Sequence, residues 1–179
     1  MTDFLDPSAA ADFDGDGKAE VLIESEWGIG VLKQNGANLT ATVMAQNGTR
    51  LGGWNLNTAN DDVALVGDFD GDGVAEVLVR SGWGIGVLKQ NGANLTATVM
   101  AQNGTRLGGW NLNTTEIPTF HDQFVAAADF DGDGKAEVLI ESEWGIGVLK
   151  QNGANLTATA MAKSGTRLGG WLLNTTVAH

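Results

Sequence analysis

Residues 12–58 read DFDGDGKAEVLIESEWGIGVLKQNGANLTATVMAQNGTRLGGWNLNT, and the rest of the chain repeats this stretch twice with few changes. The motif DFDGDG begins at residues 12, 68 and 129, so the copies step by 56 and then 61 residues. A fixed period of this length indicates one supersecondary unit that has been copied. The 179-residue chain therefore divides into three units, residues 1–58, 59–114 and 115–179, and a longer connection at 114–128 supplies the five extra residues.

The copies are almost the same. Residues 27–58 and 83–114 match at all 32 positions. Such identity indicates either a recent duplication or deliberate engineering, and we favour engineering.

Each unit contains four short runs with the composition of β-strands, which in the second copy are residues 63–69, 75–81, 84–90 and 95–101. The acidic motif separates the first two runs. Asn91-Gly92 separates the last two, and this dipeptide is typical of a two-residue hairpin because both residues tolerate positive φ. The sequence therefore predicts an all-β chain of four-stranded antiparallel meanders, and at this period the meander is typical of a β-propeller blade.

Three blades are too few for a propeller, since closed rings typically have four to eight blades. An open row would expose apolar sheet faces at both ends. We therefore expect closure by homo-oligomerisation, with six blades in a homodimer and blade 1 packed on blade 3 of the partner. A nine-bladed trimer is the larger alternative.

The net charge is −12, from 22 acidic and 10 basic residues, and this disfavours nucleic acids and anionic membrane surfaces as partners. There is no cysteine, which excludes disulfides and thiolate metal sites. The start, MTDFLDPSAA, lacks the basic and apolar regions of a signal peptide, and no apolar run approaches the length of a membrane span. The sequence predicts a soluble protein without membrane insertion and does not indicate its compartment.

The motif DFDGDGKAE places carboxylates at loop positions 1, 3, 5 and 9, a pattern that suits the oxygen-rich, flexible coordination of Ca²⁺ better than the octahedral geometry of Mg²⁺. A backbone carbonyl at position 7 would add a ligand. The predicted ligands are Asp12, Asp14, Asp16, Lys18 and Glu20; Asp68, Asp70, Asp72, Val74 and Glu76; and Asp129, Asp131, Asp133, Lys135 and Glu137. The loop is no EF-hand, because position 12 is Ile23, Val79 or Ile140 and strands flank it. The alternative is an acidic turn without metal, in which the close carboxylates would repel one another.

A propeller strand, an acidic loop of this form and a second strand resemble the FG-GAP/integrin-α type of calcium repeat. The combination ADFDGDGKAEVLI with WGIGVLKQNG resembles, more specifically, the blades of fungal lectins of the Psathyrella velutina type. This resemblance covers essentially the whole chain. It implies a seven-bladed propeller that binds calcium and, in pockets between blades, N-acetylglucosamine, with sialic acid as a further possibility. The chain departs from that family in having three blades and nearly identical copies.

All six tryptophans occupy repeated positions, either after the second strand or in the LGGW motif. In a four-stranded blade the turn between strands 2 and 3 lies on the same face as the connection to the next blade, so both tryptophans meet at the seam. Packing between blades is one interpretation. The other is a sugar site, in which tryptophan forms an apolar platform beside directional polar groups. The candidate sugar-binding residues are Ser25, Glu26, Trp27, Arg50, Trp54, Asn55 and Asn57; Ser81, Trp83, Arg106, Trp110, Asn111 and Asn113; and Ser142, Glu143, Trp144, Arg167, Trp171 and Asn174.

These features favour a multivalent carbohydrate-binding protein in which linked weak sites raise avidity. A calcium-stabilised scaffold without ligand, designed or structural, is the alternative. Catalysis is disfavoured, because the repeat contains no Cys, Tyr or His from which to build a nucleophile–base pair.

Overall fold

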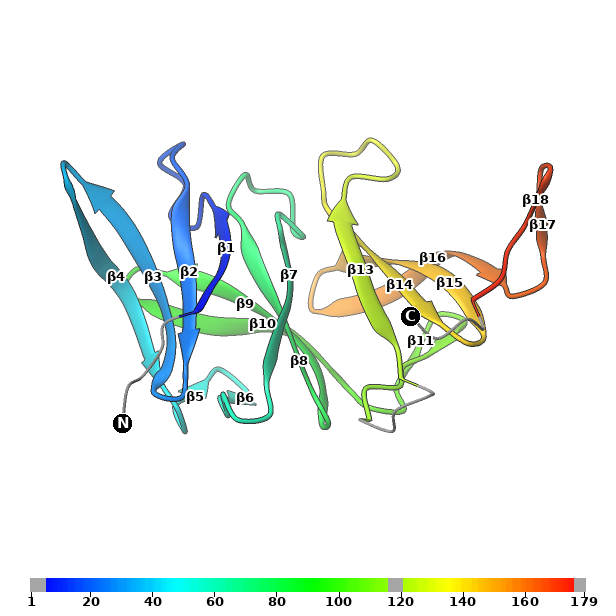
Figure 1. The fold of residues 1–179 in the computed structure, drawn as a ribbon, viewed down its shortest axis with the longest axis horizontal. Helices are drawn as coiled ribbons and strands as arrows, with labels where there is room; N and C mark the ends of the chain where they lie inside the picture. Colours follow the sequence, from blue (N-terminus) through cyan, green and yellow to red (C-terminus); the bar gives the residue numbers. More distant parts are fainter. Residues whose placement is uncertain (1–5, 116–120, 176–179) are drawn as a thin grey trace.

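The computed structural model describes residues 6–115 and 121–175, which form three four-stranded antiparallel sheets in a row (Figure 1). In each sheet the strands pair in chain order, as the meander prediction requires. The first blade has β1 (Asp6–Ala11), β2 (Glu20–Ser25), β3 (Gly28–Asn35) and β4 (Asn38–Gln46). The second has β7 (Asp62–Gly67), β8 (Glu76–Ser81), β9 (Gly84–Asn91) and β10 (Asn94–Gln102). The third has β13 (Gln123–Ala128), β14 (Glu137–Ser142), β15 (Gly145–Asn152) and β16 (Asn155–Lys163).

The connection after each blade is itself folded, which the sequence analysis did not predict. Its two-residue strands pair as a hairpin, namely β5 (Arg50–Leu51) with β6 (Trp54–Asn55), β11 (Arg106–Leu107) with β12 (Trp110–Asn111), and β17 (Arg167–Leu168) with β18 (Trp171–Leu172). The turn is Gly52-Gly53 in the first hairpin, and Gly52 adopts a φ of +64°, a conformation that glycine takes without strain. The turn thereby holds Leu51 and Trp54 as a cross-strand pair, and both are buried.

The hydrophobic core lies in the seams between blades. One cluster joins blade 1 and its hairpin to blade 2 and includes Leu22, Val31, Trp54, Val79 and Leu95. A second joins blade 2 and its hairpin to blade 3 in the same way, through the residues at equivalent positions. Each blade therefore completes its core only with a neighbour, as expected for repeats that cannot bury an apolar face alone.

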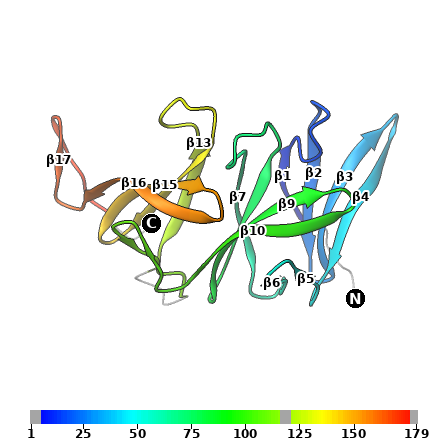
Figure 2. The same ribbon diagram turned by 180° about the vertical axis from the view of Figure 1, so that it is seen from behind.

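The described blades form an open row and no closed ring, as the front and rear views show (Figures 1 and 2). The fold-class prediction is thus confirmed for the all-β, four-stranded units, while closure by a partner chain stays a prediction. Part of the predicted 114–128 connection is β13, the first strand of blade 3. No helix in the described ranges has the length and apolar character needed to cross a membrane.

Candidate metal and ligand sites

Each DFDGDG loop joins the first two strands of its blade and is folded around its first aspartate. The carboxylate of Asp12 accepts hydrogen bonds from the backbone N–H groups of Gly15 and Gly17, both at 2.7 Å. Asp68 and Asp129 accept equivalent bonds from the glycines of their own loops. These bonds hold the loop in a tight curve with the remaining carboxylates on its inner side.

The structure brings the four acids of each motif together. One carboxylate oxygen from each member lies within 4.8 Å of the others in three sets: Asp12, Asp14, Asp16 and Glu20; Asp68, Asp70, Asp72 and Glu76; and Asp129, Asp131, Asp133 and Glu137. Each set could hold a metal ion. These sets contain side-chain ligands alone. Metal binding by the backbone carbonyls of Lys18, Val74 and Lys135 stays a prediction.

The glutamate at the end of each motif is the best evidence that the loop fits a cation. Glu20, Glu76 and Glu137 are each 1% exposed. One oxygen of Glu76 accepts a bond from the N–H of Phe69 at 2.7 Å, whereas the other is buried and has the ammonium of Lys89 as its partner, 2.9 Å away. A buried carboxylate oxygen is costly unless it is paired with a cation or a donor. The equivalent oxygens of Glu20 and Glu137 are buried in the same way beside the ammonium groups of Lys33 and Lys150.

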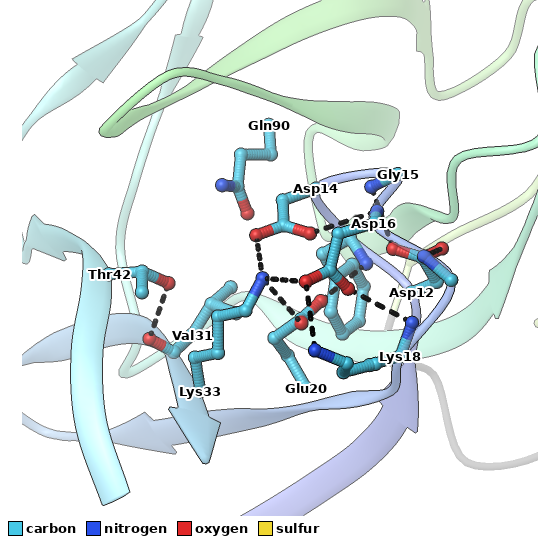
Figure 3. A network of polar contacts seen from close by, with 12 residues as sticks. Asp12, Asp14, Gly15, Asp16, Lys18, Glu20, Val31, Lys33, Thr42 and Gln90 are labelled. Atoms are coloured by element: carbon cyan, nitrogen blue, oxygen red, sulfur yellow. Dashed lines mark hydrogen bonds and ion pairs between the residues drawn. The ribbon is translucent and has the colours of Figure 1, made fainter. Parts of the chain in front are cut away.

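A lysine that the sequence analysis missed lies in each cluster (Figure 3 shows the first). In blade 2 the Lys89 ammonium lies 2.6 Å from Asp70, 2.7 Å from Asp72 and 2.9 Å from the buried oxygen of Glu76. Lys33 and Lys150 make the corresponding contacts in blades 1 and 3. The signal was available, because GVLKQNG repeats this lysine in every copy. A bound metal ion and the ammonium would compete for the same oxygens.

The pKa values in the second cluster reflect burial and this ion pair. Burial raises the pKa of Glu76 to about 7, against the stabilising bonds from Lys89 and Phe69. Burial also opposes the charge of Lys89, but its bonds to the three carboxylates outweigh burial and raise its pKa above the usual value. The ammonium therefore stays charged, and Glu76 is the member of the pair that takes up a proton as the pH falls.

The next blade also reaches toward the first cluster. Figure 3 shows the side chain of Gln90, from β9, pointing toward Asp14. Its amide nitrogen donates to the carbonyl of Gly92 at 3.1 Å, as the equivalent Gln34 donates to Gly36 at 3.0 Å. The carbonyl oxygen of Gln90 is buried and accepts no hydrogen bond from the described residues. The oxygen of Gln151, at the equivalent position of blade 3, is likewise buried without a donor. These amides were not among the predicted ligands.

A pocket of about 500 Å³ lies at the seam between blades 1 and 2. Trp54, from the first hairpin, and Trp83, from the turn after β8, contact each other edge to face with ring centroids 5.6 Å apart. Trp54 is buried, whereas Trp83 is 49% exposed and presents its ring to solvent. The remaining lining residues are small or polar: Gly53, Asn55, Asn57, Asn60, Asp61, Ser81 and Gly82.

A buried aspartate that the sequence analysis missed organises this pocket. The Asp61 carboxylate accepts bonds from the indole N–H of Trp54 and the backbone N–H of Asn57, both at 2.8 Å. Burial raises the pKa of Asp61, and the two bonds only partly offset that effect. Asp122 does the same for Trp110 and Asn113 at the next seam. The available signal was an aspartate immediately before the first strand of blades 2 and 3.

The seam between blades 2 and 3 carries a second, smaller pocket of about 290 Å³. Trp110 and Trp144 form an equivalent edge-to-face pair at 5.6 Å. The main difference is that Glu143 lines this pocket where Gly82 lines the first. The second pocket is therefore both smaller and more acidic.

The acidic loops and seams together allow comparison with known proteins. The chain matches the FG-GAP-like repeat family over residues 12–79 and 68–140, which together span more than two thirds of its length. The chain belongs to this family. A search of curated proteins gave no match.

Each FG-GAP match runs from the first aspartate of one acidic loop into the second strand of the following blade. Each match therefore contains the last three strands of one blade, its hairpin, and the first strand and acidic loop of the next blade, and so it spans one seam. The chain contains two such matches, which is also the number of seam pockets described above.

The FG-GAP repeats bring together only part of the predicted sugar-binding set. The first pocket unites Trp54, Asn55, Asn57, Ser81 and Trp83, and the second unites Trp110, Asn111, Asn113, Ser142, Glu143 and Trp144. Neither pocket includes Ser25, Glu26, Trp27, Arg50, Arg106, Arg167, Trp171 or Asn174. The three arginines lie at exposed positions of their hairpins, and the other five lie on the outer sides of blades 1 and 3, which no other described blade covers.

Proposed function

We propose that this FG-GAP protein is a multivalent carbohydrate-binding protein without catalytic activity, with one sugar pocket at each seam and calcium in the acidic loops. The observation that carries the sugar proposal is the pair of seam pockets, each with a half-exposed tryptophan ring beside buried, oriented polar groups. N-acetylglucosamine is the proposed ligand, on the strength of the lectin resemblance.

The lining of the first pocket supplies the two elements that a sugar site needs. The exposed ring of Trp83 offers an apolar platform for a pyranose face or an acetamido methyl group. Asn55, Asn57 and Ser81 offer directional donors and acceptors around it. A volume of about 500 Å³ lies within the range of small-molecule pockets.

The two pockets would differ in ligand preference. A carboxylate on the ligand, as in sialic acid, would meet Glu143 and Asp122 in the second pocket. In the first pocket Gly82 replaces the glutamate and leaves Asp61 as the acid. We therefore propose that an acidic sugar binds the first pocket in preference to the second, because like charges repel at short range.

Replacement of Trp83 by alanine is expected to weaken N-acetylglucosamine binding at the first pocket about tenfold or more, because the platform is lost. Titration calorimetry, in calcium and again after chelation, measures this. The matched Trp83→Phe variant keeps an aromatic face and should retain most of the affinity, while Asn94→Ala, at an exposed position of β10 outside the pocket, should change nothing. Absence of any binding heat in the parent protein would refute the sugar proposal and favour the ligand-free scaffold.

The calcium proposal rests on the clustered carboxylates and on the buried glutamate oxygen in each cluster, which needs a positive charge beside it. In blade 2, Asp68, Asp70, Asp72 and Glu76 would hold the ion, which supplies positive charge that pins the loop between β7 and β8. Lys89 provides part of that charge when no ion is bound. Its side chain would have to leave the carboxylates as the ion enters.

Replacement of Lys89 by methionine tests this competition. In chelator the variant is expected to lose about 2 kcal/mol of unfolding free energy, between the values of an exposed and a fully buried ion pair. In saturating calcium the loss should disappear, because the ion replaces the ammonium and stabilises by mass action. Chemical denaturation with and without calcium measures both effects.

The matched control is Arg80→Met, which removes the surface pair between Arg80 and Asp62 at 2.8 Å and should cost at most about 1 kcal/mol in either buffer. Calcium that stabilises neither the parent nor the Lys89 variant would contradict the calcium proposal. A Lys89 variant as stable as the parent in chelator would show that the ammonium does not stabilise the cluster.

A further inference from the structure

Two seams join neighbouring blades within the chain. The outer side of blade 1 and the outer side of blade 3 carry the same two surfaces that meet in each of these seams. We name the apolar surface of blade 1 formed by Ile23, Leu32, Leu39 and Met44 the leading flank. We name the surface of blade 3 and its hairpin formed by Phe130, Leu168, Gly170 and Trp171 the trailing flank. Blades 2 and 3 cover their own leading residues with the preceding blade, and blades 1 and 2 cover their trailing residues with the following one.

The trailing flank is exposed only where a following blade is lacking. Trp54 and Trp110 are 4% and 3% exposed, whereas Trp171, in the same LGGW motif, is 84% exposed. Phe130 and Leu168 are also exposed, while their counterparts in the first two blades are buried. The difference lies in the neighbour, because the motif is the same in all three copies.

The leading flank shows the reverse pattern. Leu39 is 60% exposed, although Leu95 and Leu156 at the equivalent positions are 3% and 4% exposed. Ile23 is half-buried where Val79 and Ile140 are fully buried. Leu32 is likewise less buried than its two counterparts. The surface that is covered twice inside the chain is thus left open on blade 1.

The contacts within the chain show how the two flanks fit. The ring of Trp54 lies against Gly86, and that of Trp110 lies against Gly147. The equivalent glycine in blade 1 is Gly30, which has only Ile23 and its own sheet near the position a Cβ would take. Trp171 therefore lacks the contact with a glycine that Trp54 and Trp110 make, and Gly30 lacks the corresponding contact with a tryptophan.

A second contact pairs the glycine of each hairpin with a methionine of the next outer strand. Met100 packs against Gly53 and Met161 against Gly109. In the remaining copy Met44 is 64% exposed, against 40% and 43% for Met100 and Met161, and nothing lies within 4 Å of the Cβ position at Gly170.

The backbone repeats the same complementarity. The N–H of Ala75 donates to the carbonyl of Asp12 at 2.7 Å, and that of Ala136 donates to Asp68 at 2.7 Å, so each acidic loop is tied to the following blade. The corresponding groups are the N–H of Ala19, in blade 1, and the carbonyl of Asp129, in blade 3. Neither has a backbone partner among the described residues.

We propose that a second copy of this chain docks head to tail, with the trailing flank of each chain on the leading flank of its partner, so that two chains close a ring of six blades. Each new seam forms a composite ligand pocket from Trp171 and Asn174 of one chain and Ser25, Glu26 and Trp27 of the other, which are five of the eight predicted residues that lie outside the two internal pockets. This pocket rests on the proposed sugar function; the docking does not. Six blades lie within the usual range for propellers.

The composite pocket would differ from the two internal ones at two or more positions. Seven residues before its acidic motif blade 1 has Leu5, where blades 2 and 3 have Asp61 and Asp122, the acceptors of the tryptophan N–H in the internal pockets. Leu172 replaces the asparagine found at positions 55 and 111, so the new pocket offers one amide fewer. Glu26, in the turn between β2 and β3, would line the composite pocket as Glu143 lines the second internal pocket.

Light scattering after size exclusion tests the docking on the full chain. The expected mass is twice 18.6 kDa, and Trp171→Ala and Leu39→Asp should each convert the protein to single chains. Arg167→Ala, an exposed position on the same hairpin whose counterparts stay exposed in covered hairpins, should leave the mass unchanged. A parent protein of single-chain mass throughout its soluble range would overturn the proposal, as would a mass that keeps growing with concentration.

Mixing the variants distinguishes head-to-tail docking from pairing of like surfaces. Trp171→Ala retains an intact leading flank and Leu39→Asp an intact trailing flank, so the mixture should regain a two-chain species through one intact seam. Dissociation by Leu39→Asp with no effect of Trp171→Ala would indicate blade 1 paired on blade 1 and would overturn the proposal.

Ligand counting separates the docking from the sugar function. Binding of N-acetylglucosamine at three sites per chain in the parent and two in Trp171→Ala would support the composite pocket. A two-chain mass without any sugar binding would refute the proposed function and leave the docking intact. Two sites per chain in a confirmed two-chain ring would overturn the composite pocket alone.

Discussion

Replacement of Gly84 by alanine is expected to lower the free energy of unfolding by more than about 3 kcal/mol, because the new methyl group would overlap the backbone. Gly84 begins β9 with a φ of +155°, and a Cβ there would lie 2.1 Å from the carbonyl oxygen of Ala101. That oxygen belongs to the backbone of β10, which is paired with β9 on both sides of this point. The overlap therefore cannot be relieved by moving a flexible side chain. Chemical denaturation followed by tryptophan fluorescence and circular dichroism measures the loss.

The matched control lies two residues earlier in the same turn. Gly82 has no atom within 4 Å of the position a Cβ would take and does not adopt the left-handed conformation. Gly82→Ala should therefore change the unfolding free energy by no more than about 0.5 kcal/mol. If Gly84→Ala were tolerated as well as this control, the close pairing of β9 with β10 at the turn would be wrong.

Replacement of Trp54 by alanine is expected to cost about 3–5 kcal/mol, the usual range for deleting a large buried aromatic side chain. The ring packs against Gly86 of the next blade, contacts Trp83 edge to face, and donates its N–H to Asp61. Alanine would leave a cavity in the seam and a buried carboxylate with one donor fewer. The same denaturation experiment detects the change.

The chain contains its own control for this substitution. Trp171→Ala alters the same residue of the same motif, but in a hairpin that lies on no following blade of its own chain. In dilute single chains it should cost less than about 1 kcal/mol. Equal losses for the two variants would contradict the packing of the first hairpin on blade 2.

The strands could be predicted from the sequence because their signals are local. Alternating apolar residues and the Asn91-Gly92 turn specify β9 and β10 within a single hairpin, and the structure places both strands within one residue of the prediction. The acidic loop was equally readable, since its aspartates are neighbours in sequence. Hairpin β5–β6 was missed because its strands have only two residues each and are too short to show alternation.

The ammonium in each acidic cluster depends on contacts that are distant in sequence. Lys89 lies 19 residues after Asp70, and only the pairing of β8 with β9 brings them together. Burial is even less local. Leu39 and Leu95 lie in identical 32-residue segments, yet one is exposed and the other buried, because only the second has a preceding blade. No local pattern can separate two identical segments.

The hairpins that fold each blade onto the next also determine where a single chain opens. Blades coupled only to their neighbours behave as a one-dimensional array, in which the ends have fewer couplings than the middle. Hairpin β17–β18 has no blade to lie on, so it should fray before the rest. Blade 2 is held on both sides and should exchange its amide hydrogens most slowly, so three units of almost the same sequence would show a gradient of protection along the chain.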